Sequence, residues 1–179
     1  MIPRDDVVAV VVDIQERLFP HIHGQNLLAE NTIKLIKGLK ILGVPLIVTQ
    51  QYTKGLGATI PQVAEALVDF DPIEKLTFSC FGDPDFINVL DDSGKNHIIL
   101  MGIESHVCVL QTAMDLLNIG YEVILVEDCV SSRRLNDKQV ALQRMRDDGV
   151  IITTYESILF ELMKVAGTEE FKTISNLVK

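Results

Sequence analysis

The sequence predicts an α/β fold, a three-layer α/β/α sandwich built on a parallel sheet of about six strands. Short apolar, β-branched runs alternate with helical segments along the chain, which is typical of a parallel sheet covered by helices on both faces. The first run, Val7–Val12, is continuously apolar, as expected for a strand buried on both sides. With 179 residues, 47% of them hydrophobic, the chain can bury one large core, so we expect a single domain over residues 1–179.

The first half of the chain is expected to alternate three strands with three helices. Apolar residues recur at helical spacing until Gly43, which provides a helix stop. A later segment begins with Pro61, a residue favoured in the first turn of a helix. The expected elements are the strand Val7–Val12, the helix Gln25–Leu42, the strand Pro45–Thr49, the helix Pro61–Val68, the strand Ile73–Leu76 and the helix Asp85–Leu90.

The second half continues the same alternation. Gly120 and Gly149 each follow a helical segment, where a residue with positive φ commonly ends a helix. Asn136 is expected to cap the helix that it begins, because its side chain can accept a hydrogen bond from the first turn. The expected elements are the strand Asn96–Met101, the helix Glu104–Asn118, the strand Glu122–Val126, the helix Asn136–Asp148, the strand Val150–Thr153 and the helices Ser157–Val165 and Thr168–Leu177.

Charge and hydropathy argue against several kinds of partner. The chain has 25 acidic and 16 basic residues and a net charge of −9, whereas a protein that binds nucleic acid needs a basic face. No apolar run approaches the ~20 residues of a membrane span. The N-terminal run is short and follows Asp5 and Asp6, not the basic residues of a signal peptide. We therefore expect no nucleic acid, no membrane and a cytoplasmic location.

Cysteines and histidines give no sign of a metal or a cofactor. The three cysteines, Cys80, Cys108 and Cys129, form neither a CxxC motif nor a disulfide framework. His21 and His23 form an HxH pair, but no third ligand accompanies them. Nothing in the sequence matches a phosphate-binding glycine loop. We expect no cofactor and no metal.

Three residues at the carboxyl ends of expected strands could carry chemistry, because ligands of open α/β sheets bind at that edge. Asp13 follows the first strand, Lys75 ends the third, and Cys108 lies early in the helix after the fourth. They supply a base, a cation and a nucleophile. Each also has an ordinary structural interpretation: a helix cap or salt bridge, a surface lysine and a packed thiol. His106 is a poor base for Cys108, since residues two apart on a helix do not face each other.

Several segments, in this order, resemble the isochorismatase-like cysteine hydrolases over essentially the whole chain. Two further segments resemble the small isochorismatase-domain hydrolases within that family. The family segments are Val11-Val12-Asp13-Ile14-Gln15, Glu74-Lys75-Leu76-Thr77-Phe78-Ser79, Met101-Gly102-Ile103-Glu104-Ser105-His106-Val107-Cys108-Val109 and Asp128-Cys129-Val130-Ser131-Ser132-Arg133, and the subgroup segments are Thr49-Gln50-Gln51-Tyr52-Thr53-Lys54-Gly55-Leu56-Gly57 and Ser157-Ile158-Leu159-Phe160-Glu161-Leu162.

The resemblance implies a role for each of the three residues. Asp13 would be the general base, Lys75 the charge partner and Cys108 the nucleophile. It also implies the strand order 3-2-1-4-5-6, a cis peptide bond between Ile103 and Glu104, and an oxyanion hole formed by the backbone N–H groups of Glu104 and Cys108. The substrate pocket is expected to involve Phe19, Gln50, Tyr52, Phe78 and Ile103.

The expected function is a metal-independent cysteine hydrolase that acts on a small amide, ester or related C–N substrate through an acyl-enzyme intermediate. The stretch Gln50-Gln51-Tyr52-Thr53 lacks the Asp-x-His motif by which the family's nicotinamidases bind metal. True isochorismatases need not carry the cysteine, so Cys108 favours acyl chemistry. The alternative is a non-catalytic small-molecule-binding or interaction protein on the same fold. A nuclease is disfavoured by the acidic charge and the missing metal ligands.

Two further expectations concern Cys108 and the helix that follows it. A helix N-terminus and Lys75 would lower the pKa of the thiol below its free value of about 8.5, although the like charge of Asp13 opposes this unless Asp13 carries the proton, so the pair is coupled. The helix Glu104–Asn118 is apolar on more than one side: one stripe is formed by Val107, Leu110, Met114 and Leu117, and Val109, Ala113 and Leu116 extend the apolar character round the helix. Hydrophobicity around a helix implies a second buried contact. We expect a homo-oligomer with this helix near the interface; the alternative is cover from the helix Ser157–Val165.

Overall fold

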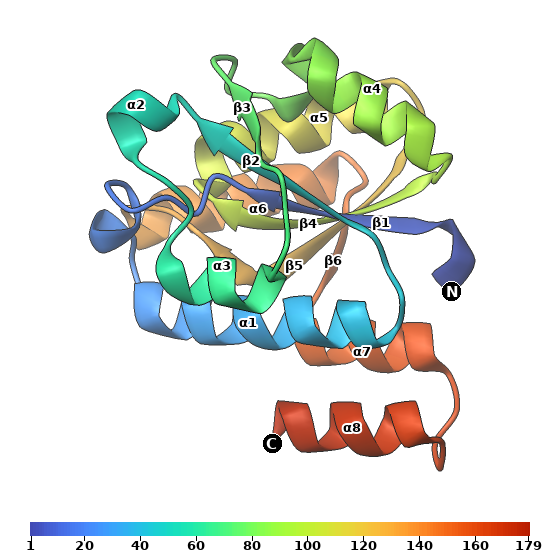
Figure 1. Ribbon diagram of the computed structural model, residues 1–179. Helices are drawn as coiled ribbons and strands as arrows, with labels where there is room; N and C mark the ends of the chain where they lie inside the picture. The colour runs from blue at the N-terminus through green and yellow to red at the C-terminus, as the bar shows by residue number, and fades with distance from the viewer.

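Figure 1 shows the computed structural model, which describes residues 1–179. Six parallel strands form one sheet in the predicted order β3-β2-β1-β4-β5-β6. The strand order reverses between β1 and β4, so their carboxyl ends mark the expected position of a ligand site. The strands are β1 (Val7–Val12), β2 (Leu46–Gln51), β3 (Ile73–Lys75), β4 (His97–Ile103), β5 (Glu122–Ser131) and β6 (Ile151–Thr153).

Helices cover both faces of this sheet (Figure 1). On one face lie α1 (Gln25–Ile41), α3 (Pro61–Leu67) and α7 (Tyr155–Met163), with α8 (Glu169–Val178) packed outside them. On the other face lie α4 (Pro84–Ser93), α5 (Leu110–Asn118) and α6 (Leu135–Asp147). The short helix α2 (Thr53–Leu56), which the sequence did not predict, follows β2 at its carboxyl end. No helix combines the length and the apolar character that crossing a membrane requires.

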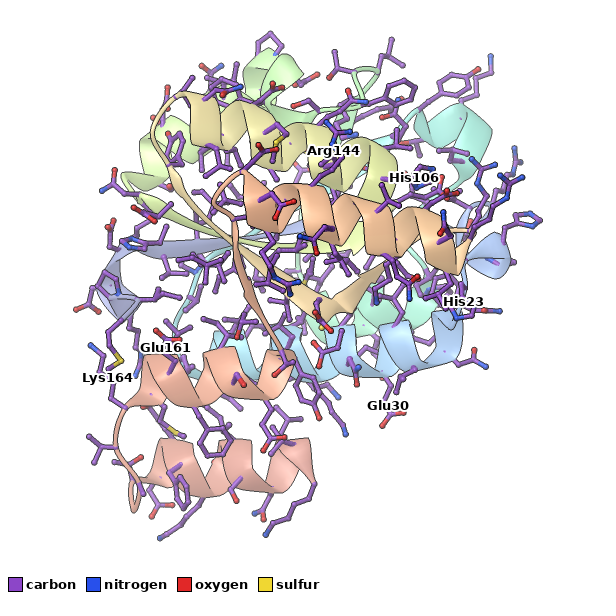
Figure 2. The ribbon with its side chains drawn as sticks, turned by 180° about the vertical axis from the view of Figure 1, so that it is seen from behind. His23, Glu30, His106, Arg144, Glu161 and Lys164 are labelled. Atoms are coloured by element: carbon purple, nitrogen blue, oxygen red, sulfur yellow. The ribbon has the colours of Figure 1, made fainter.

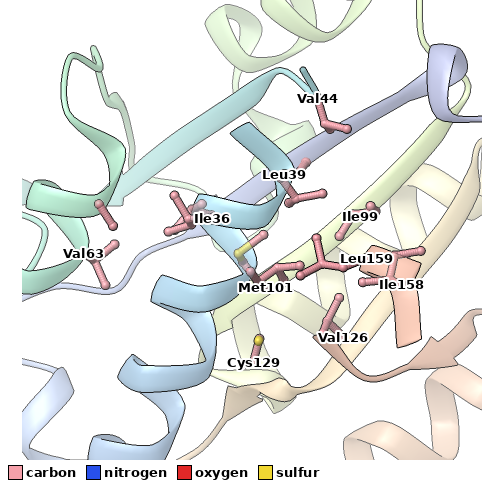
Figure 3. Close-up of a cluster of buried hydrophobic side chains, with 14 of the residues drawn as sticks. Ile36, Leu39, Val44, Val63, Ile99, Met101, Val126, Cys129, Ile158 and Leu159 are labelled. Atoms are coloured by element: carbon pink, nitrogen blue, oxygen red, sulfur yellow. The ribbon is translucent and has the colours of Figure 1, made fainter. Parts of the chain in front are cut away.

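The central strand β1 explains the unbroken apolar run at the start of the chain. Its side chains alternate between two core clusters. Val7, Ala9 and Val11 belong to the cluster under α1, and Val8, Val10 and Val12 belong to the cluster under α5. Figure 3 shows part of the first cluster, in which Ile36 and Leu39 of α1 lie near residues of β4 and α7. A strand covered on both faces must be apolar at every position.

A glycine allows β1 and β4 to approach closely beside the expected site. Gly102 has a φ of +125°, and a Cβ atom added there would lie 2.1 Å from the carbonyl oxygen of Val12. Backbone occupies that space, so no rotamer change could relieve the clash. Gly102 is therefore required where the strand order reverses.

Most element boundaries differ from expectation by one to three residues, and a few differences are larger or change an interpretation. β5 continues to Ser131 instead of ending at Val126, because it resumes pairing with β4 after a register shift. Glu127 and Asp128, which looked like the start of a loop, lie inside this strand. The helix expected from Glu104 begins as a π-helical turn, Ser105–Val109, before α5. Asn136 does not cap α6, since the N-cap position is Arg134. The helix expected at Ser157–Val165 is α7, which packs on α1 and therefore does not cover α5.

Candidate active site

Asp13 stands at the end of β1 as a fully buried carboxylate. Its backbone is in the left-handed region, with a φ of 50°. Its Oδ1 atom accepts a hydrogen bond of 2.8 Å from the hydroxyl of Thr49, and its Oδ2 atom accepts one of 2.7 Å from Nζ of Lys75. Both oxygens thus have a donor, which a buried carboxylate requires. The arrangement holds the side chain in one orientation.

Lys75 crosses the end of β2 to reach Asp13, although β3 and β1 are two strands apart. Its side chain has no exposed surface. Nζ also lies 2.8 Å from Oε1 of Gln51, 3.2 Å from the carbonyl oxygen of Thr77 and 3.0 Å from that of Phe78. Burial opposes the charge, but Asp13, with smaller contributions from the two nearby thiols, raises the pKa of Lys75 above its ordinary value. With three N–H donors and four acceptors, the ammonium has no proton left for a substrate and acts as a fixed charge.

Cys108 lies in the π-helical turn that joins β4 to α5, and it is only 6% exposed. Single π turns are frequent at functional sites. Its side chain also packs in the core cluster under α5, so the structural interpretation holds alongside the chemical one. Burial raises the pKa of the Cys108 thiol, and the charge of Asp13 raises it further, while Lys75 acts in the opposite direction. The expectation of a lowered pKa is therefore wrong for the free protein, because burial and Asp13 outweigh the cation.

Glu104 connects the nucleophile turn to β5. The peptide bond between Ile103 and Glu104 is cis. Oε1 of Glu104 accepts hydrogen bonds of 3.0 Å from both the backbone N–H and Nε of Arg133. The backbone carbonyl of Glu104 accepts from Val107 and Val109, whereas its own N–H makes no hydrogen bond within the chain. A free backbone donor thus stands next to the turn that carries Cys108.

Gln51, not Gln50, is the glutamine that contacts the charged pair. Besides Lys75, Gln51 bonds to Gln15, whose Oε1 accepts its backbone N–H at 2.7 Å. The amide of Gln50 is used elsewhere, donating to Thr59 and accepting from Thr53. Sequence reasoning noted both residues after the second strand but selected Gln50 for the pocket. The signal in the sequence that distinguishes Gln50 from Gln51 is alternation along a strand, because adjacent side chains point to opposite faces of the sheet.

The other expected pocket residues are divided between the core and the surface. Ile103 is fully buried in the cluster under α1, on the opposite face from Cys108, so its side chain cannot line a pocket at the thiol. Phe19 packs against that same cluster. Tyr52 and Phe78 are 47% and 54% exposed near the carboxyl ends of β2 and β3.

One large cavity lies away from the candidate site. It has a volume of about 560 Å³ and is lined by Val44, Leu46 and Val68 among others, with none of Asp13, Lys75 or Cys108. Asp13, Lys75 and Cys108 are themselves only 0%, 1% and 6% exposed, so the three candidate residues are enclosed in the single chain.

Two other groups of residues considered in the sequence are His106 beside Cys108 and the pair His21 and His23. Figure 2 shows His106 between α5 and α6, where its Nδ1 lies 2.9 Å from the hydroxyl of Ser132. The structure contains no cluster of three or more His, Cys, Asp or Glu side chains able to hold a metal ion, and His21 and His23 remain an isolated pair.

A model of the isochorismatase domain matches residues 7–157. The chain belongs to the isochorismatase-like hydrolase family. It is 38% identical to the secreted isochorismatase effector Isc1 of Phytophthora sojae over 191 aligned residues, which cover 100% of this chain and 87% of that protein.

Solved structures agree with this family and with the six-stranded fold. The MAR1 ribonuclease of Caenorhabditis elegans superposes with a TM-score of 0.91 at 37% identity, covering 99% of this chain and 91% of that one. The YcaC gene product of Escherichia coli, described as an octameric hydrolase of unknown specificity, gives a TM-score of 0.91 at 21% identity over 98% of this chain and 89% of its own. At that identity, the second likeness concerns the fold alone.

Proposed function

We propose that this isochorismatase-family protein is a metal-independent cysteine hydrolase of a small amide, ester or related C–N substrate. The observation that carries the proposal is the buried Asp13–Lys75 ion pair, 2.7 Å long, beside a cysteine whose pKa responds to both charges. A base, a fixed cation and a nucleophile are the parts that acyl transfer needs.

Each group has one role in the proposed reaction. Asp13 takes the thiol proton of Cys108 as Sγ attacks the substrate carbonyl, and the oxyanion is held by the backbone N–H groups of Glu104 and Cys108. Asp13 then protonates the leaving amine or alcohol, the bond to it breaks, and a thioester remains. Water attacks the thioester after giving a proton to Asp13, and that proton returns to Sγ as the acid product leaves. Because the thiol of Cys108 is protonated in the free protein, the transfer of its proton to Asp13 accompanies the attack of Sγ on the carbonyl.

The substrate pocket that we propose is smaller than the sequence suggested. Tyr52 and Phe78 remain as its apolar rim, while Ile103 contributes only backbone. The free N–H of Glu104 supports the assignment of an oxyanion donor.

A hydrolysis screen with a cysteine-less blank tests the function. Small amides, esters and ureides are incubated with the wild-type protein and with Cys108→Ala, and product release is followed. We expect hydrolysis of at least one compound by the wild type only. Equal activity of both proteins on every compound hydrolysed would reject the cysteine mechanism and favour the binding-protein alternative.

Ribonuclease activity is the second candidate, because the structural relative with 37% identity is described as a ribonuclease. The net charge of −9 argues against it, since RNA carries a dense negative charge. Incubation with labelled RNA, using Cys108→Ala and Asp13→Asn as comparisons, distinguishes the two. RNA cleavage that depends on Asp13 but not on Cys108 would overturn the acyl-transfer proposal.

The same site supports the proposal that the reaction is independent of metal. The ammonium of Lys75 occupies the position beside Asp13 that a divalent cation would need, and no other ligand cluster exists. We expect activity to survive prolonged chelation. Loss of hydrolysis on chelation, with recovery on adding zinc or manganese, would contradict this.

We also propose that the protein is a homo-oligomer with α5 near the interface. Leu110 of the expected stripe is buried in the core under α5, whereas Val107, Met114 and Leu117 are only half-buried against that core. α7 lies on the opposite face of the sheet and does not cover them. Sedimentation at micromolar concentration should give at least a dimer, and a monomer near 20 kDa would reject the proposal.

A further inference from the structure

A buried threonine connects the charged pair to a second thiol. Thr49 of β2 is fully buried, and its hydroxyl donates to Oδ1 of Asp13 at 2.8 Å. The same hydroxyl lies 3.8 Å from Sγ of Cys80, which is also fully buried. One threonine thus touches both the proposed base and a second thiol.

Cys80 in turn reaches the nucleophile through another buried threonine. Its backbone N–H donates to the hydroxyl of Thr112 at 2.9 Å, and that hydroxyl donates to the backbone carbonyl of Cys108 at 2.7 Å. Thr112 has no exposed surface. Asp13, Thr49, Cys80, Thr112 and Cys108 therefore form one continuous buried chain of polar contacts, which we call the threonine circuit.

The threonine circuit joins three parts of the site that are far apart in sequence. Asp13 and Thr49 lie at adjacent strands, Cys80 follows the segment that carries Lys75, and Thr112 belongs to α5. Apolar side chains of the core cluster under α5 surround these groups. In such surroundings an unsatisfied polar group is costly, so a fully bonded network specifies a single arrangement.

We propose that Thr49 and Thr112 are positioning residues of the reaction, which act as one unit through Cys80 to fix the Asp13 carboxylate relative to the turn of Cys108. Thr49 sets the orientation of the base, and Thr112 anchors the backbone of the nucleophile. This inference rests on the proposed cysteine mechanism. Neither threonine has exposed surface from which to contact a substrate, so both act through the residues that they hold.

The test measures how fast iodoacetamide labels Cys108, by peptide mass mapping at fixed pH. Thr49→Val and Thr112→Val keep the side-chain shape and remove the hydroxyl. Each should slow labelling roughly 10- to 100-fold, as expected when a buried hydrogen bond to a charged or catalytic group is lost. Because the two residues act as one unit, the double variant should be no slower than the slower single variant by more than about twofold.

Matched variants separate positioning from general damage to the fold. Thr49→Ser and Thr112→Ser keep the hydroxyl and should label within about threefold of wild type. Thr32→Val is the control, since Thr32 is equally buried but its hydroxyl makes no hydrogen bond to any residue of the threonine circuit. Cys80→Ala keeps the backbone N–H that reaches Thr112, so it should slow labelling less than either valine variant. On any compound hydrolysed in the screen, kcat should fall in the valine variants while KM stays within about twofold.

The outcomes distinguish the positioning role of the two threonines from the proposed cysteine mechanism on which it rests. Wild-type Cys108 that labels no faster than Cys129 would overturn both. A reactive wild-type Cys108 together with unchanged or faster labelling in the two valine variants would overturn only the positioning role. Additive effects in the double variant would show two independent contacts and would reject the circuit as a unit. Should a valine variant fail to fold, the alanine variant at that position gives the same comparison.

Discussion

The chain contains two groupings of an aspartate, a lysine and a cysteine, and only one of them has the geometry of a reactive site. In the first, Lys75 contacts Asp13 at 2.7 Å and the pKa of the lysine is raised. In the second, Asp128 and Cys129 lie within β5 and Lys138 on α6, and Lys138 makes no ion pair within 4.0 Å. Burial dominates there and lowers the pKa of Lys138.

The difference shows that the residue types alone do not define the chemistry. Burial raises the pKa of both Cys108 and Cys129, and in each case the neighbouring aspartate raises it further. Cys129 is fully enclosed in the core under α1, whereas Cys108 retains 6% exposure beside a saturated ion pair. A direct contact between Lys75 and Asp13, and access to the thiol, separate the two groupings.

The largest expected effect is on catalysis, which should depend on one thiol only. Cys108→Ala should lower hydrolysis at least about a thousandfold, because no other group can form the acyl intermediate. Cys129→Ala should retain activity within about threefold. Turnover of any compound identified in the screen measures both, with circular dichroism as the check on folding. Loss of activity in both variants with intact folds would remove the distinction between the groupings.

The next effect is on stability, where replacing Lys75 should be costly and replacing Lys138 should not. Lys75→Met leaves the buried Asp13 carboxylate without its cation, which should lower the free energy of unfolding by about 3–5 kcal/mol. Lys138→Met removes a partly buried ammonium that has no contact partner, so the change should be close to zero. Urea denaturation at pH 7 measures both.

A double variant checks the reason for the lysine effect. Asp13→Asn combined with Lys75→Met removes both charges and should recover part of the stability that Lys75→Met loses. Equal losses from the two lysine variants would mean that direct contact with Asp13 is not what distinguishes Lys75.

A smaller effect tests the close approach of the strands that bring Asp13 and Cys108 together. Gly102→Ala should destabilise the protein by about 3 kcal/mol or more, since the new Cβ would meet backbone of β1 at a positive φ. Gly120→Ala is the control: its φ is +98°, yet nothing lies within 4 Å of the new Cβ. Its cost should be about 1–2 kcal/mol from conformation alone. Thermal unfolding of both variants separates the clash from the strain.

The smallest effect concerns alkaline pH and the thiol of the second grouping. Burial raises the pKa of Cys80 to about 11 and also raises those of Cys108 and Cys129. Above pH 9 the unfolded chain therefore loses thiol protons that the folded chain retains, and the free energy of unfolding falls as pH rises. The limit is about 1.4 kcal/mol per pH unit for each thiol.

Cys129→Ala removes one of the buried thiols. The free energy of unfolding should therefore fall less steeply with rising pH, by the contribution of that thiol. Urea denaturation between pH 8 and 10.5, compared with wild type, measures it. An unchanged slope would mean that Cys129 titrates alike in the folded and unfolded chain, contrary to its burial.

The sequence by itself determined the fold class, the strand order through its family resemblance, and the edge of the sheet where chemistry should lie. The run Val7–Val12 predicts the central strand with its observed boundaries, because burial on both faces demands an apolar residue at every position. Asp13, Lys75 and Cys108 could be selected because each stands at or just after the carboxyl end of a strand, a property of local pattern.

Tertiary structure alone decided which neighbours those residues have. The reach of Lys75 across β2, the choice of Gln51 over Gln50 and the threonine circuit all depend on how separate strands are registered. The extension of β5 to Ser131 depends on renewed pairing with β4. The pKa of Cys108 was predicted in the wrong direction because desolvation is set by the packing of distant segments around the thiol, and no local pattern reports it.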